Sequence, residues 1–252
     1  MEKILRSLVA ACLGFAALFA GAAHATTVSP VIVDLQSSGR GVVANISVNN
    51  TGASSLPIEI HVTPLTPTAT GLQPGKADSD DDLLVTPPSA LVPAGTTQTF
   101  RVQWIGDPEL TASKHYYVSI DQLPVKLPEG QSAVQVVYNF QVLVSVSSPD
   151  KKPELAVTAV APVIVDGKPA VAITVRNNGQ AHGYISQHRL KITATDSSGA
   201  EIFSKTISGA EFQQLVGYGL VATGQSRTVD VPVDQLPKSS KLSAILMDER
   251  AQ

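Results

Sequence analysis

The sequence predicts an all-β protein made of two sandwich domains. Val provides 29 of the residues after position 25, and its branched Cβ favours extended backbone. Thirteen of the 17 Pro fall between Pro30 and Pro153, where they exclude long helices. Short apolar runs alternate with turn residues at intervals of about 8–12 residues, which is typical of β-sandwiches.

The first 25 residues have the layout of a secretory signal peptide. Basic residues precede an apolar run over residues 8–20, and Ala23–Ala25 is a small-x-small cleavage site. The run is too short to span a bilayer, and cleavage would leave a mature chain that begins at Thr26. A lipid-modified Cys12 is the alternative interpretation, although the apolar run continues well past that residue.

The mature chain divides into two predicted domains, residues 26–149 and 150–252, with the boundary in a polar stretch flanked by Pro149 and Pro153. The strands expected in the first domain are 31–35, 41–48, 58–63, 83–86, 97–105, 116–122 and 134–147. Those expected in the second are 155–160, 170–176, 188–195, 201–207, 227–233 and 241–247. Domains of ~120 and ~100 residues have the size of immunoglobulin-like sandwiches.

Composition and motifs exclude several function classes. The formal net charge is -3, so the chain has no basic excess to neutralise phosphates and is not expected to bind nucleic acid. The single Cys excludes a disulfide scaffold and a Cys-based zinc site. No stretch after the signal reaches the ~18 apolar residues of a membrane span, so we expect a soluble exported protein without membrane insertion.

Catalytic and metal-binding motifs are also missing from the sequence. It contains no nucleophile elbow, no phosphate loop and no pair of His that flanks a Glu at helical spacing. Asp78–Asp82 is acidic but lacks the Gly and the distal Glu of a calcium loop, and His182 and His188 meet only if a turn brings them together. We therefore expect no enzymatic activity, no cofactor and no metal.

The strand expected at 134–147 carries an uninterrupted apolar row at every second position. Its C-terminal half fits a buried core strand, whereas its N-terminal half is expected to run beyond its own sandwich as an edge for pairing with another chain. A bulge would shift the row by one residue and put Val137 into it. The row comprises Val134, Val136, Tyr138, Phe140, Val142, Val144 and Val146.

Several stretches resemble the periplasmic pilus-assembly chaperones of the PapD-like family. Leu83–Pro88 with Val92–Gly95 is similar to the strand-and-turn signature of that family. His115–Pro124 is similar to its aromatic strand, Thr27–Pro30 to its N-terminal strand, and the strand that closes at Pro149 falls where the family has its donor strand.

The resemblance implies an L-shaped pair of immunoglobulin-like domains that works in the periplasm and is not an enzyme. Such chaperones capture pilus or fimbrial subunits, which lack their last strand, by donor-strand complementation, and hand them to an outer-membrane usher. It implies that Val134, Val136 and Tyr138, with Phe140 next, bind the subunit. The exposed edge would also allow a self-dimer.

One feature of the family is missing from this chain. The family anchors the subunit's C-terminal carboxylate with two basic residues, but the matching stretches 31–34 and 143–145 contain neither Lys nor Arg. Arg101 is therefore a possible cleft cation, and we hypothesise that Arg101→Ala weakens subunit capture. The alternative is that Arg101 is a partly exposed cation on a solvent face.

Two other functions are open on the sequence alone. A structural or adhesive two-domain protein would use strand pairing to polymerise, but its subunits should lack a closing strand, and both domains here have a full strand count. An exported hydrolase is supported by no residue constellation. The sequence therefore favours the chaperone.

Overall fold

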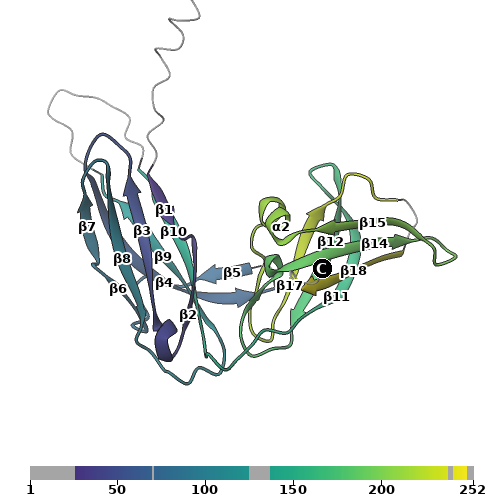
Figure 1. The fold of residues 1–252 in the computed structure, drawn as a ribbon, viewed down its shortest axis with the longest axis horizontal. Helices are drawn as coiled ribbons and strands as arrows, with labels where there is room; N and C mark the ends of the chain where they lie inside the picture. Colours follow the sequence, from purple (N-terminus) through teal and green to yellow (C-terminus); the bar gives the residue numbers. More distant parts are fainter. Residues whose placement is uncertain (1–25, 70, 125–136, 238–240, 249–252) are drawn as a thin grey trace, which may run out of the picture.

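The computed structural model describes residues 26–69, 71–124, 137–237 and 241–248. It shows two β-sandwich domains set at an angle to each other, which confirms the predicted fold class and its L shape (Figure 1). The predicted signal peptide at 1–25 and the predicted strand residues Val134 and Val136 lie outside the described residues.

The first domain packs two sheets face to face. One sheet has the order β1 (Thr27–Ser29), β3 (Val43–Asn50), β8 (Thr96–Trp104) and β6 (Leu83–Thr86). The other has the order β2 (Ile32–Gln36), β10 (Asn139–Ser147), β9 (Lys114–Gln122), β4 (Leu56–Thr68) and β5 (Gly71–Pro74), with β7 (Ser89–Val92) paired to β4. A single apolar core, which includes Trp104 and Tyr116, lies between the sheets.

The second domain has a separate core between two three-stranded sheets. One sheet has the order β11 (Leu155–Val165), β12 (Lys168–Asn177) and β17 (Ser226–Pro232). The other has the order β15 (Glu201–Ile207), β14 (His188–Thr195) and β18 (Lys241–Asp248). A small pair, β13 (Gly183–Tyr184) and β16 (Leu220–Val221), lies beside them with the short helices η2 (Ile185–Gln187) and α2 (Gly209–Leu215).

The N-terminal segment changes sheets within a few residues. β1 pairs with β3, whereas β2 lies in the opposite sheet and pairs in parallel with β10 from Leu143 to Ser147. The short 3-10 helix η1 (Gly39–Val42) then leads into β3. Because β2 meets only the C-terminal part of β10, the two halves of β10 have different surroundings.

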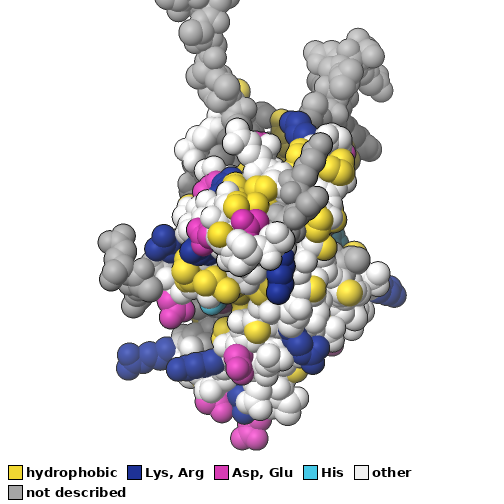
Figure 2. All heavy atoms as spheres, turned by 90° about the vertical axis from the view of Figure 1, so that its right-hand side faces the viewer, with side chains coloured by type: hydrophobic (Ala, Val, Ile, Leu, Met, Phe, Trp, Pro, Cys, Tyr) yellow, Lys and Arg dark blue, Asp and Glu magenta, His cyan; other side chains and the backbone are white. Residues whose placement is uncertain are grey.

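The second domain presents no single large apolar patch on the face that Figure 2 shows. Apolar side chains lie there in small groups between charged ones. The β4–β5 hairpin reaches from the first domain towards the second (Figure 1), where Leu72 and Arg227 line the same hollow. Both domains thus line the hollows beside this hairpin, which makes the surface between them a candidate binding site.

A buried asparagine holds the start of the second domain together. The side chain of Asn177 is fully buried, and its Nδ2 donates to the carbonyls of Ala181 at 2.8 Å and Val221 at 3.1 Å. Its Oδ1 accepts from the backbone N–H groups of Glu154 at 3.0 Å and Gly179 at 2.9 Å. One side chain thus connects the incoming linker to β12 and β16.

We expect Asn177→Ala to lower the free energy of unfolding by about 3 kcal/mol, because it leaves buried backbone groups without partners. Urea denaturation followed by circular dichroism measures this. The control is Asn178→Ala, which removes an exposed side chain and should cost less than about 0.5 kcal/mol. Equal losses in the two variants would contradict the assigned role of Asn177.

Candidate functional site

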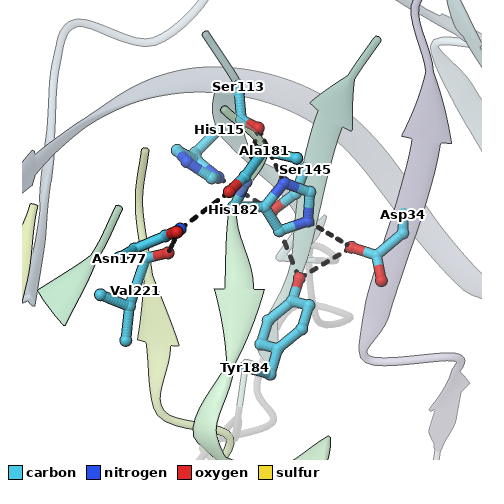
Figure 3. A network of polar contacts seen from close by, with 9 residues as sticks. All are labelled: Asp34, Ser113, His115, Ser145, Asn177, Ala181, His182, Tyr184 and Val221. Carbon is cyan, nitrogen blue, oxygen red and sulfur yellow. Dashed lines mark hydrogen bonds and ion pairs between the residues drawn. The ribbon is translucent and has the colours of Figure 1, made fainter. Parts of the chain in front are cut away.

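The outer face of the sheet β2–β10–β9 carries polar side chains that meet the second domain. Side chains alternate across a strand, so Val33, Tyr116 and Val144 point into the core. Their neighbours Asp34, His115 and Ser145 therefore point outward, towards β13 (Figure 3).

Four polar residues form a contact between the domains, which we name the interdomain clamp: Asp34 and Ser113 of the first domain, and His182 and Tyr184 of the second (Figure 3). The Nε2 of His182 lies 3.0 Å from Oδ1 of Asp34, and the hydroxyl of Tyr184 donates to the same oxygen at 2.8 Å. The Oγ of Ser113 accepts from the backbone N–H of His182 at 2.9 Å and lies 3.0 Å from its Nδ1. Both ring nitrogens of His182 are thus occupied.

The clamp favours an ionised Asp34. Burial opposes ionisation of this carboxyl, but the hydrogen bonds from His182 and Tyr184 outweigh it and hold the pKa of Asp34 below its usual value. Burial also raises the pKa of the Tyr184 hydroxyl, which therefore remains a donor. Because 46% of the Asp34 side chain is exposed, solvent screening keeps the contribution of the clamp to stability modest.

His115 lies behind the clamp as a buried neutral imidazole. It is 2% exposed, and its Nδ1 lies 2.9 Å from Oγ of Ser145. Burial lowers the pKa of His115 to about 3; the nearby His182 adds to this effect and Asp34 opposes it. Among the described residues, its Nε2 has no hydrogen-bond partner.

A cleft of about 330 Å³ lies between the domains beside the clamp. Its first-domain wall comes from β2, β5, β9 and β10, and its second-domain wall from the segment after α2 and from β17. Tyr218 connects the two features, since its ring packs against Tyr184 of the clamp with the centroids 6.5 Å apart. The residues that line the cleft are Val31, Ile32, Leu72, Tyr117, Gln141, Leu143, Val216, Gly217, Tyr218, Gly219, Leu220 and Arg227.

The predicted apolar row of β10 changes from buried to exposed along the strand. Val142 and Val144 are fully buried, and Phe140 is partly buried against the same core. Tyr138 precedes the strand and is 49% exposed, with its ring stacked on Phe140 at 6.0 Å. Val137 is 48% exposed. The structure therefore brings Tyr138 and Phe140 together where the row leaves the core.

Among the residues that the structure describes, no strand covers one edge of the N-terminal half of β10, which we call its open edge. Asn139–Val142 pairs with β9, whereas the parallel ladder to β2 begins only at Leu143. The N–H of Leu143 donates to the carbonyl of Val31 at 3.0 Å. Backbone groups two residues apart point to the same side, so the N–H and C=O of Gln141 face the open edge.

The architecture is similar to solved structures of a known group. No protein-family model and no curated protein sequence matches the chain. The class 5 fimbriae chaperone CfaA superposes with a TM-score of 0.53 and 15% identity, over 88% of this chain and 99% of that chain. The chain has the fold of the fimbrial chaperones.

Two complexes give similar values. A chain of a chaperone–tip adhesin complex of CFA/I fimbriae biogenesis superposes with a TM-score of 0.51 and 14% identity, over 88% of this chain and 98% of that chain. A chain of the CsuC–CsuE chaperone–tip adhesion subunit pre-assembly complex from Acinetobacter baumannii gives 0.51 and 14%, over 87% and 97%. At these identities the likeness shows the fold alone.

Arg101 is not among the residues that line this cleft. It lies on β8 between the buried Phe100 and Val102, so its side chain points away from the core on the sheet opposite to the one that carries Asp34. It does not line the cleft described above. A role of Arg101 in capture stays a prediction, without a contact in the cleft to support it.

Neither the clamp nor a role for Arg227 is predicted by the sequence. The stretches 31–34 and 143–145 contain Asp34 and Ser145, but no pattern in the sequence connects these residues with partners in the second domain. One signal was present, since His115 directly precedes two aromatic residues and Ser145 lies between Val144 and Val146. Buried polar residues at such positions need a partner, and here the partners lie at or beside the domain interface.

No metal site and no membrane-spanning helix is found in the part of the chain that the structure describes. No three His, Cys, Asp or Glu side chains among those residues are placed to hold a metal ion. None of the helices described there is long and apolar enough to cross a membrane.

We expect the free energy of unfolding to fall by about 2 kcal/mol between pH 6.5 and pH 5 because of His115. Its pKa is about 3 in the folded chain, so in this range only the unfolded chain takes up the proton. The stabilisation is complete above the unfolded pKa and is lost as the pH falls towards the folded one. Urea denaturation at several pH values measures the slope.

His115→Phe keeps an aromatic ring at this position. It should reduce the proton uptake on unfolding, and with it the slope of the unfolding free energy against pH, by about one proton. The control is His61→Asn, since a hydrogen bond with Asp78 raises the pKa of the partly exposed His61, which gives the opposite pH dependence. His61→Asn should therefore retain the acid-induced loss. The same slope in His115→Phe as in the native chain would refute the assignment.

Proposed function

We propose that this protein is a periplasmic chaperone that binds pilus or fimbrial subunits by strand addition and delivers them to an outer-membrane usher. The observation that carries the proposal is the open edge of β10 at Asn139–Val142, next to the point where the apolar row leaves the core. An added strand gains main-chain hydrogen bonds from such an edge, and its specificity comes from alternate side chains.

The similar structures support a subunit as the partner. Those neighbours include a chaperone bound to a tip adhesin and a chaperone–subunit pre-assembly complex. The periplasmic location rests on the signal peptide expected at 1–25 and on this likeness. Delivery to an usher rests on the family resemblance.

A structural subunit is the less favoured alternative. In the first domain β10 closes the core with its own Val142, Val144 and Val146, so this sandwich does not need a strand from a neighbour. We propose no catalytic activity. Most buried polar atoms of the interface contact one another in the clamp and in the His115–Ser145 pair, and Nε2 of His115 is the exception noted above.

We expect Gln141→Pro to abolish subunit capture while the chain stays folded. Proline removes the N–H that faces the open edge, and a proline at such an edge position does not break the ladder to β9. The matched control Gln141→Ala removes the side chain, keeps the N–H and should retain capture. The measurement is affinity purification of the tagged chain from the periplasm of its host, with mass spectrometry of the proteins that copurify.

Stoichiometric small exported β-proteins, lost in Gln141→Pro and kept in Gln141→Ala, would support the proposal. Val136→Arg should also lose them, because a charge enters an apolar groove only at a high cost. Undiminished capture by Gln141→Pro would exclude this edge. A native chain that is purified as a clean self-dimer without any subunit would instead favour the structural alternative.

A further inference from the structure

A row of outward-facing side chains on the first domain is buried by the second domain. The register of the strands β2, β10, β9 and β4 places Asp34, Ser145, His115 and Leu65 side by side across the outer face of their sheet. The last three of them are buried, although they point away from the first-domain core. The second domain covers this row, since His182 packs edge-on against His115 with the ring centroids 5.3 Å apart (Figure 3). His115 therefore reaches water when the domains separate.

A second proton on His115 has no acceptor in this interface. The Nδ1 of His115 lies 2.9 Å from Oγ of Ser145, whereas its Nε2 has no hydrogen-bond partner among the described residues. A protonated imidazole donates through both of its nitrogens. A buried N–H without an acceptor costs free energy, and a buried charge costs more. The closed interface is therefore compatible with the neutral form of His115 but not with the charged form.

His182 differs from His115 in this respect. Its two ring nitrogens each lie 3.0 Å from an oxygen that can accept a hydrogen bond, Oδ1 of Asp34 and Oγ of Ser113. An additional proton on His182 is therefore accommodated without a change in the contact. Burial raises the pKa of the Tyr184 hydroxyl, which remains a donor to Asp34. His115 is thus the residue of this cluster whose protonation opposes closure.

The groups that face His115 do not remove this penalty. Burial is the largest influence on the pKa of His115 and, together with the nearby His182, lowers it to about 3, although Asp34 on β2 acts in the opposite direction. Its neighbours across the sheet, Ser145 on β10 and Leu65 on β4, carry no charge. The proton is therefore bound weakly as long as the domains stay together.

We propose that the contact between the domains is an acid-sensitive hinge, which opens when His115 takes up a proton. In the open form, water supplies the second acceptor that the closed interface lacks. The walls of the cleft beside the clamp belong to different domains, so the same step moves these walls apart. The inference does not depend on the proposed strand addition.

The direction of the pH dependence follows from the two states of His115. In the open form its pKa returns towards the ordinary 6.5, whereas the closed form keeps the value of about 3. The preference for the closed form is therefore complete above pH 6.5 and is lost as the pH falls towards 3. Between pH 7.5 and pH 5 the ratio of open to closed molecules should rise about 30-fold. Asp34 stays ionised in this range, because its pKa lies below its usual value.

Hydrogen exchange of single backbone amides, followed by NMR without denaturant, measures this opening. The N–H of His182 donates to Oγ of Ser113, and the N–H of Ser113 donates to Oγ1 of Thr223, so both bonds cross between the domains. The N–H of Asn177 donates to the carbonyl of Gln225 within the second domain and reports unfolding. The quantity compared is the protection factor, which corrects for the intrinsic pH dependence of exchange.

In the native exported chain at pH 7.5, we expect the amides of His182 and Ser113 to be at least tenfold less protected than that of Asn177. Between pH 7.5 and pH 5 the protection of His182 and Ser113 should fall together, by about 30-fold. Equal protection of all three amides would mean that the contact opens only by unfolding, which would overturn the hinge. A fall at His182 alone would assign the change to its own loop and would also overturn it.

His115→Phe and His115→Gln cannot take up the proton, so the protection of the His182 and Ser113 amides should agree within about twofold at the two pH values. The Gln variant keeps a polar group beside Ser145 and serves if the Phe variant does not fold, which circular dichroism shows. The control is His61→Asn, because His61 is partly exposed and bonded to Asp78 in its own domain, and it should keep the full fall. A fall that persists without His115, or native protection that is independent of pH, would refute the inference.

Discussion

β2 pairs with β10 only from Leu143 onward, and the different properties of the two halves of β10 depend on this point. From Leu143 onward, β10 lies between β9 and β2, and its apolar row is fully buried. Before Leu143 the same strand has one partner strand, and its other row of backbone groups meets no strand of the described ranges. An edge of this kind is a hazard for a soluble protein, which natural sheets normally cover or blunt. In this protein the open edge of β10 is retained beside an apolar row that becomes exposed. This combination favours strand addition.

The domain angle depends on a contact that a sandwich core cannot provide. Each domain has its own apolar core, so burial of apolar surface stabilises the domains separately. The clamp joins them through polar groups, and its geometry depends on the orientation of both rings, His182 and Tyr184. Such hydrogen bonds add little stability at a half-exposed carboxylate but strongly constrain direction. The clamp therefore fixes the relative position of the walls of the cleft more than it stabilises the fold.

Local patterns in the sequence predicted the strands but not the contacts between domains. The predicted bounds of β14 and β15 coincide with the observed ones, because alternation and turn residues define both. Helix α2 was missed, although Ser208 and Glu211 form the start of a capping box, and Ser208 Oγ accepts from the N–H of Glu211. β4 runs on to Thr68 because pairing with β5 prolongs it.

Local sequence patterns could not predict the clamp, for a physical reason. His182 and Asp34 are 148 residues apart, so no spacing or periodicity connects them. Their contact depends on the angle between two domains with separate cores, which local propensity does not encode. The position of Arg227 in the cleft is likewise not predictable from the sequence. Arg227 lies near the start of β17, and it lines the cleft only because the first domain packs beside it.

The two domains contribute opposite charges to the interface between them. The first strand, where the chaperone family has a basic anchor residue, contributes Asp34 here, and this carboxylate is bound within the chain. Arg227 lies on the other wall, partly buried and without an ion pair within the described ranges. The interface thus carries a carboxylate whose hydrogen-bond donors come from the second domain, and a guanidinium that donates to the carbonyl of Leu220.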